Sequence, residues 1–262
     1  SHDGTATSGY YSGHGAWGPI MGTAYTRPIG QWSRGQYAGA NNTQDDFAVV
    51  QANSIPLRAD DVGAPTAPTT LSSSPISVGG LIGTQADVDA FQFTTAGGQV
   101  SFAAKPAPYA ADLDIKLSLL DGNGAVVASA DPPVAMIDAT TASGMDAALS
   151  ATVAAGTYRI VVDGTGYGDP LSTGYSDYAS VGPYTLTATF PTSANVAPTA
   201  VAAASATSGA IAASARPPSV ASTLAARSGV WVVVLGSDTR AGLCSTEWFR
   251  HNAHSSRACR SL

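Results

Sequence analysis

The beginning of the chain holds side chains of the kinds that serve a catalytic metal. His2 is followed by Asp3 and Gly4, and Met21 lies in a Pro-Ile-Met-Gly run. A catalytic zinc takes three protein ligands and keeps a fourth position for a water whose pKa it lowers. One imidazole cannot hold such an ion, so His2 on its own predicts a solvated side chain. His14 lies between the two motifs and either approaches a cleft or has a structural role in a glycine-rich loop. Because most histidines are not metal ligands, we expect the structural role.

Aspartates in the middle of the chain form a second set of candidate ligands. Asp112 and Asp114 are separated by one residue, and Asp163 and Asp169 bracket a glycine-rich stretch. Carboxylates at short spacing suit Ca²⁺, which takes six or more oxygen ligands. The alternative is that each aspartate bonds its own backbone in a turn. Because no complete D-x-D-x-D-G series is present, the sequence leaves calcium binding open.

Both cysteines lie near the end of the chain with two histidines: Cys244, His251, His254 and Cys259. A zinc finger needs a wider histidine spacing and a ββα pattern, and a disulfide between the cysteines is the alternative. The surrounding residues show no hydrophobic period. We therefore expect residues 216–262 to be disordered, or to result from a shifted reading frame.

Composition favours strands, and it argues against a nucleic-acid partner and against a membrane span. Only 11% of the 262 residues are charged, whereas 28 Gly and 16 Pro supply many turns. The net charge of −6 is concentrated in residues 61–190, which carry twelve acids and three bases. Nucleic-acid phosphates require Lys and Arg, so no nucleic-acid partner is expected. No run of about 18 apolar residues is present, so no membrane span is expected.

One helix is predicted in residues 1–58, a segment rich in glycine and aromatic residues. Asn42 or Thr43 is suited to cap it, and Asp45 and Asp46 then lie in the first turn, where the helix dipole favours acids.

Residues 59–190 alternate between apolar and polar residues in short runs separated by Gly, Pro and Asp. Such runs without helical periodicity predict a β-sandwich, and Asp121–Gly124 has the residues of a hairpin turn. Residues 191–215 have the Ala, Ser, Thr and Pro composition of a linker. The expected fold is therefore mainly β: a jelly-roll-like sandwich preceded by a small α+β segment and followed by a disordered tail.

Two motifs in residues 1–58 resemble the reprolysin-like zinc metallopeptidases of the metzincin clan. The His-Asp-Gly run at residues 2–4 is similar to the end of the zinc motif, and the Pro-Ile-Met-Gly run at residues 19–22 to the Met-turn beneath the zinc ligands. The resemblance continues through residues 31–37 and 40–46.

This resemblance implies a site and a reaction. It implies that His2 is the third zinc ligand and that Asp3 and Met21 support the site. It further implies that residues 23–34, Tyr25 among them, wall the substrate cleft. The reaction would be hydrolysis of a peptide bond by a zinc-bound water.

The remainder of the zinc motif, H-E-x-x-H, does not occur in the chain, whose one glutamate is Glu247. That motif supplies two zinc ligands and the general base. We therefore expect this chain to be the C-terminal fragment of a secreted zinc endopeptidase and to be inactive by itself.

The segment 59–190 resembles the bacterial pre-peptidase C-terminal domain. The resemblance rests on several separate runs: Asp87–Phe93, Leu113–Leu117, Gly156–Gly164, Gly174–Tyr178 and Tyr184–Leu186. It implies a secreted accessory module that assists secretion, keeps an enzyme soluble, or binds a protein substrate or an extracellular polymer such as a polysaccharide. A non-catalytic binding module and a purely structural surface protein are the alternatives. Asn195–Ala202 resembles the entry to a polycystic-kidney-disease-type repeat.

Overall fold

The structure is a computed structural model that describes residues 2–192, all of which belong to one compact unit. The predicted linker beyond Thr192, the repeat-like run at residues 195–202, the tail and its Cys and His residues lie outside the described residues.

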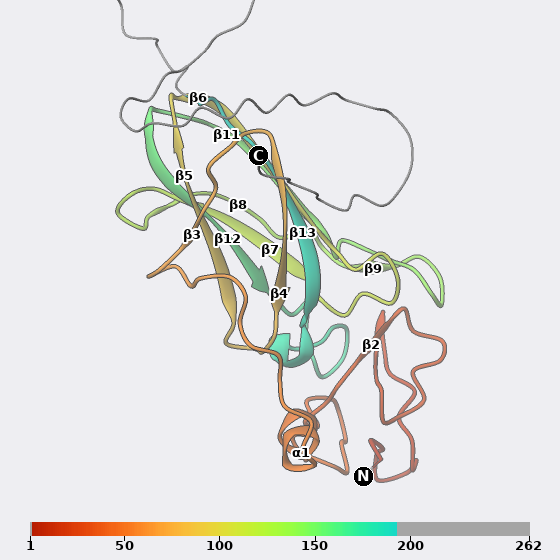
Figure 1. Cartoon of the computed structure of the whole chain (residues 1–262). Coiled ribbons are helices and arrows are strands. Elements are labelled where there is room, and N and C mark those ends of the chain that lie inside the picture. Colours follow the sequence, from red (N-terminus) through yellow and green to blue (C-terminus); the bar gives the residue numbers. More distant parts are fainter. Residues whose placement is uncertain (1, 193–262) are drawn as a thin grey trace, which may run out of the picture. The chain divides into compact units, whose positions relative to one another are not determined.

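Two sheets form the sandwich (Figure 1). The five-stranded sheet has the order β3-β5-β12-β7-β8, and the four-stranded sheet has the order β11-β6-β13-β4. Neighbouring strands are antiparallel, except that β3 runs parallel to β5. The strands are β3 (Thr69–Thr70), β4 (Ile76–Ile82), β5 (Val88–Thr95), β6 (Gly98–Pro106), β7 (Ile115–Leu120), β8 (Val126–Ala130), β11 (Ala147–Val153), β12 (Gly156–Gly164) and β13 (Gly182–Thr189).

The core between the sheets follows from alternation along the strands. In β13 the residues Tyr184, Leu186 and Ala188 are buried, and the threonines between them are exposed. A strand directs successive side chains to opposite faces, so this pattern buries one face. Phe93 lies at the centre, with its ring centroid 5.1 Å from that of Phe102 on the opposite sheet. The prediction of a mainly β sandwich is confirmed.

The hairpin between β7 and β8 is also confirmed. Asp121 accepts hydrogen bonds from the backbone N–H groups of Asn123 and Ala125, at 2.8 and 2.9 Å. Gly124 has φ of 87°, a conformation that glycine adopts without strain.

Residues 2–58, here called the N-terminal segment, contain little regular structure. Strands β1 (Trp17–Pro19) and β2 (Ile29–Gln31) pair in parallel, and helix α1 spans Asp46–Ala52. The N-cap is Asp45, whose carboxylate accepts from the Ala48 N–H, and neither Asn42 nor Thr43 caps the helix as expected. The helix begins later than expected because Asp45 is extended and its own carboxylate satisfies the Ala48 N–H, and the Asp46 carboxylate accepts from the Ser33 N–H.

The N-terminal segment packs against the sandwich along a contact that we call the seam. Its apolar part is a cluster in which Trp17, Ile29 and Tyr37 of the segment meet residues of the sandwich, namely Val134, Met145 and Tyr175. The loop between β12 and β13 supplies most of the polar contacts. A second pair of short strands, β9 (Ala135–Met136) and β10 (Ala142–Ser143), lies beside this cluster, where Ala142 packs against it.

Candidate functional site

The His-Asp-Gly run at residues 2–4 and the Pro-Ile-Met-Gly run at residues 19–22 are joined by a backbone hydrogen bond. The Asp3 N–H donates to the Met21 carbonyl at 3.0 Å, and the Gly22 N–H donates to the Pro19 carbonyl at 3.0 Å, which closes a turn. The exposed His2 ring lies against Tyr10, with 3.2 Å between Nε2 and the tyrosine hydroxyl. Within residues 2–192 His2 does not belong to any group of three potential metal ligands.

Asp3 is buried in the interior of the N-terminal segment. Its carboxylate is 1% exposed and accepts from the Asn42 side-chain amide at 3.1 Å. Burial, together with the nearby Asp46 carboxylate, raises the pKa of Asp3. Tyr37 donates to the Gly4 carbonyl at 2.9 Å in the same interior. These contacts attach residues 3 and 4 to the segment that contains Tyr37 and Asn42.

His14 and Tyr25, the other residues expected near a cleft, have different surroundings. The two ring nitrogens of His14 lie 2.8 Å from the Tyr11 hydroxyl and 2.7 Å from the Gly174 carbonyl. This ring therefore connects the N-terminal segment to the loop between β12 and β13. Tyr25 lies on the surface and is 88% exposed.

The four aspartates proposed for calcium do not assemble into one group of ligands. Asp114 is 1% exposed, accepts from Tyr175 at 2.7 Å, and has a pKa that burial raises to about 7. Burial also raises the pKa of Asp112 to about 7 and, in direction, that of Asp163. Asp169 is exposed and accepts from its own turn, which lowers its pKa. The turn thus accounts for the lowered pKa of Asp169, and burial accounts for the raised pKa of the other three. The buried Oδ1 of Asp114 has no hydrogen-bond partner among the described residues.

A different acidic group does assemble, where the entry to the sandwich meets the beginning of β5. One carboxylate oxygen from each of Asp60, Asp87 and Asp89 lies within 4.8 Å of the other two. Sequence reasoning missed this group because Asp60 and Asp87 are 27 positions apart. The available signal was the Asp-Val-Asp run, because strand geometry directs alternate side chains to the same face.

Asp89 is the buried member of this acidic group. It is fully buried, and its Oδ2 accepts from the Tyr184 hydroxyl at 2.6 Å. Tyr184 can lie there because Gly80 has no side chain: a Cβ at that position would meet the tyrosine ring. Burial raises the pKa of Asp89 to about 7, the Tyr184 hydrogen bond lowers it, and the charges of neighbouring acids raise it further.

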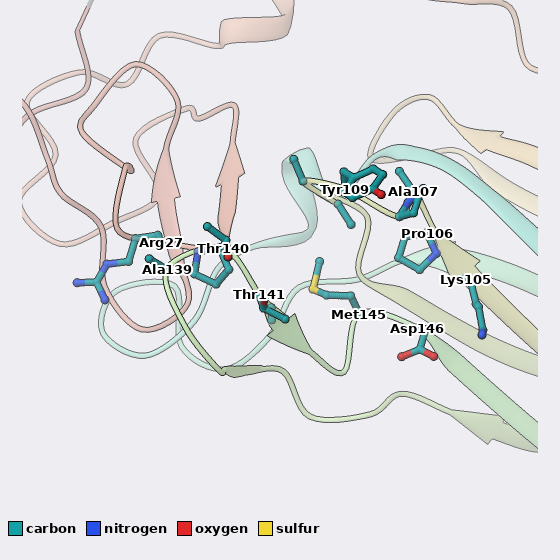
Figure 2. A pocket seen from close by; sticks show the side chains of 15 residues that line it. Arg27, Lys105, Pro106, Ala107, Tyr109, Ala139, Thr140, Thr141, Met145 and Asp146 are labelled. Carbon is teal, nitrogen blue, oxygen red and sulfur yellow. The ribbon is translucent and has the colours of Figure 1, made fainter.

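A surface hollow lies beside the seam (Figure 2). Its volume is about 830 Å³, within the usual range for ligand pockets. The loop after β6 forms one wall and includes Tyr109, which is 87% exposed. Figure 2 shows Arg27 at one end and Lys105 and Asp146 at the other. Prolines, alanines, two threonines and Met145 form the remaining lining.

No family model and no curated protein matches the chain. Among solved structures, the chain is similar to the pre-peptidase C-terminal domain of a collagenase from Bacillus anthracis. The identity is 11% and the TM-score 0.32, covering 51% of this chain and 99% of that one. It is also similar to PliG, a periplasmic inhibitor of g-type lysozyme. The Aeromonas hydrophila protein has 11% identity, a TM-score of 0.31, and coverage of 46% and 93%. The Salmonella Typhimurium protein has 14% identity, a TM-score of 0.26, and coverage of 46% and 95%.

Identities and TM-scores this low do not transfer a ligand or an activity to the chain. None of the helices among residues 2–192 is long and apolar enough to cross a bilayer.

Proposed function

We propose that residues 2–192 form a non-catalytic accessory module of a secreted protein, and that the module binds an extracellular protein or polysaccharide. The hollow beside the seam is the observation that carries this proposal. It joins an open volume of about 830 Å³ to a nearly fully exposed aromatic side chain, Tyr109. Exposed tyrosines commonly anchor partners because they bury a large area and lose little conformational entropy.

The lining of the hollow suits a polymer without a strong charge. Arg27 already forms hydrogen bonds within the protein: its guanidinium donates to the carbonyls of Ser12 and Gly15, at 3.3 and 2.8 Å. Lys105 and Asp146, at the other end of the hollow, have opposite charges. Proline, alanine and threonine surfaces beside a tyrosine can cover an extended peptide or a sugar chain by apolar contact and isolated hydrogen bonds.

Retention of the full chain on insoluble collagen, casein and chitin tests this proposal. Tyr109→Ala is expected to reduce retention on the preferred polymer roughly tenfold or more, as the loss of an anchor residue does. Leu171→Ala is the control, because Leu171 is an exposed apolar side chain, at 59%, and does not line the hollow. Retention on none of the three polymers, or equal losses in both variants, would contradict the proposal.

A second candidate is that the N-terminal segment belongs to the catalytic domain of a zinc endopeptidase. The observation that favours it is the hydrogen bond from the Asp3 N–H to the Met21 carbonyl, which places the His-Asp run beside the Pro-Ile-Met-Gly turn. In that function His2 would provide one zinc ligand. A zinc ion held by His2 and two further ligands would supply Lewis-acid chemistry there.

Sequencing the source DNA upstream of the Ser1 codon tests the second candidate. An in-frame H-E-x-x-H motif at the metzincin spacing would support it, and a polypeptide that includes this motif should then bind Zn²⁺ far more tightly than the present chain. An upstream sequence without the motif would leave His2 without partners, and the candidate would be lost. The binding proposal for the sandwich would remain, because it rests on Tyr109.

A further inference from the structure

A small cavity is formed where helix α1 meets the turn between β4 and β5, and it shares no lining residue with the hollow beside the seam. Its volume is about 260 Å³, just below the usual range of about 300–1,000 Å³ for ligand pockets. Its apolar lining comes from Phe47 and Ala48 of α1, Leu57 of the stretch that follows, and Ala86 of the turn. A cavity of this size suits one amino-acid residue rather than a polymer.

Arg34 is the basic residue that lines this cavity. The central carbon of its guanidinium lies 4.7 Å from the centroid of the Tyr178 ring. None of its N–H groups donates a hydrogen bond to a residue that the structure describes. A guanidinium on an aromatic face is held by the ring and keeps its fork of N–H donors for another partner. The partner that matches this fork with two parallel hydrogen bonds is a carboxylate.

The support beneath the Arg34 guanidinium is fixed by hydrogen bonds. Tyr178 is 5% exposed, and its hydroxyl donates to the Asp45 carboxylate at 2.7 Å. The backbone that carries Arg34 is fixed as well, because the N–H of the preceding residue, Ser33, donates to the Asp46 carboxylate at 2.9 Å. A binding group that is already ordered loses little conformational entropy when a ligand binds.

We propose that this cavity binds an organic carboxylate that carries an apolar side chain, the chemistry of the C-terminal residue of a peptide. Arg34 pairs with the carboxylate, and the apolar side chain lies against Phe47, Leu57 and Ala86. Asp45, the acidic residue of the lining, repels the carboxylate and keeps the affinity moderate. This site is independent of Tyr109 and of the polymer binding proposed above.

Titration of the full chain with N-acetyl-leucine, followed by the NMR shifts of its backbone amides, tests the proposal. The shifts should concentrate at residues 47–48 and 85–86 and saturate with a Kd on the order of 1 mM, which is usual for so small a ligand. N-acetyl-leucinamide, which has no carboxylate, should bind at least about tenfold more weakly. N-acetylglycine, which has no apolar side chain, should also bind at least about tenfold more weakly.

Four variants separate the carboxylate fork from the apolar cavity. Arg34→Gln should weaken the binding of N-acetyl-leucine at least about tenfold, and Arg34→Lys, which keeps the charge without the planar fork, roughly fivefold. Ala48→Leu fills the cavity from an exposed position of α1 with another good helix former, so it should fold normally and also lose affinity. Lys116→Gln removes the same charge on β7, outside the cavity lining, and should bind as the native protein does.

A tetrapeptide Ala-Ala-Ala-Leu with a free C-terminus distinguishes two sources of the carboxylate. Tighter binding of the tetrapeptide than of N-acetyl-leucine assigns the site to peptide ends, and equal binding assigns it to small organic acids. Two results would overturn the proposal. One is equal binding of N-acetyl-leucine and its amide, or no shift with either at a concentration roughly ten times the expected Kd. The other is native affinity in both Arg34→Gln and Ala48→Leu, which would place the ligand elsewhere on the chain.

Discussion

The sandwich and the N-terminal segment are stabilised by different means. Two sheets with a continuous apolar core hold the sandwich, whose centre contains Phe91, Phe93, Leu117 and Leu186, each 2% exposed or less. The segment has one short helix, one pair of three-residue strands and a small aromatic cluster around Trp17. Its remaining stability comes from buried polar groups and from the seam. We therefore predict that the stability of the segment depends on the sandwich more than the stability of the sandwich depends on the segment.

The largest expected effect is a loss of core packing in the sandwich. Phe93→Ala should lower the free energy of unfolding by about 3–5 kcal/mol, because Phe93 is 1% exposed and contacts aromatic rings on two sides. Trp17→Ala removes a side chain of similar size from the seam cluster, yet it should change the unfolding of the sandwich by less than about 1 kcal/mol.

Urea unfolding, with hydrogen exchange read at β7 and at β2, measures both effects. Phe93→Ala should speed exchange in both strands, and Trp17→Ala only in β2. Equal acceleration of β7 and β2 in Trp17→Ala would contradict the comparison, because it would make the segment part of the same cooperative unit as the core.

The sandwich could be predicted from the sequence because its determinants are local. Alternation in runs such as VDAFQFTT fixes which face of a strand is buried, and the Asp-Gly-Asn-Gly turn fixes a hairpin. The seam could not be predicted, because its hydrogen bonds join residues that are 81 to 160 positions apart. His14 and Gly174 are an example. The same reason hid the acidic group, since only the fold brings Asp60 to Asp87.

The next effect is a dependence of stability on pH, to which both regions contribute. Burial raises the pKa of Asp89 in the sandwich, and of Asp112 and Asp114 at the seam, each to about 7. Between about pH 4 and 7 the folded protein therefore holds protons that the unfolded chain has released. Stability should consequently rise as the pH is lowered from 8 to 5, where carboxyls with a lowered pKa, such as Asp45, are still ionised.

Melting temperatures at pH 5 and pH 8 in EDTA measure this dependence. The native protein should melt several degrees higher at pH 5. Asp89→Asn and Asp114→Asn should each reduce the difference, because an amide does not titrate. A Tm that falls from pH 8 to pH 5 would contradict the assignment.

The smallest expected effect concerns one hydroxyl at the seam. Tyr178 donates to the Asp45 carboxylate at 2.7 Å and accepts from the Phe47 N–H at 3.1 Å, so it binds the beginning of α1 to the sandwich. Its ring also contacts Phe47 and the Arg34 guanidinium. Tyr178→Phe keeps the ring and removes both hydrogen bonds. The cost should be about 1–2 kcal/mol, confined to the opening of the helix.

Hydrogen exchange in α1 is the measurement that isolates this cost. The helix amides should exchange roughly 5–30 times faster in Tyr178→Phe, while those of β12 keep their native rates. Tyr158→Phe, a matched change on β12 itself, should leave the exchange of α1 unaltered. Faster exchange in α1 and β12 together would show that the helix and the sandwich open as one unit. In that case the buried polar contacts of the seam would contribute to the stability of the whole molecule, as the aromatic core does.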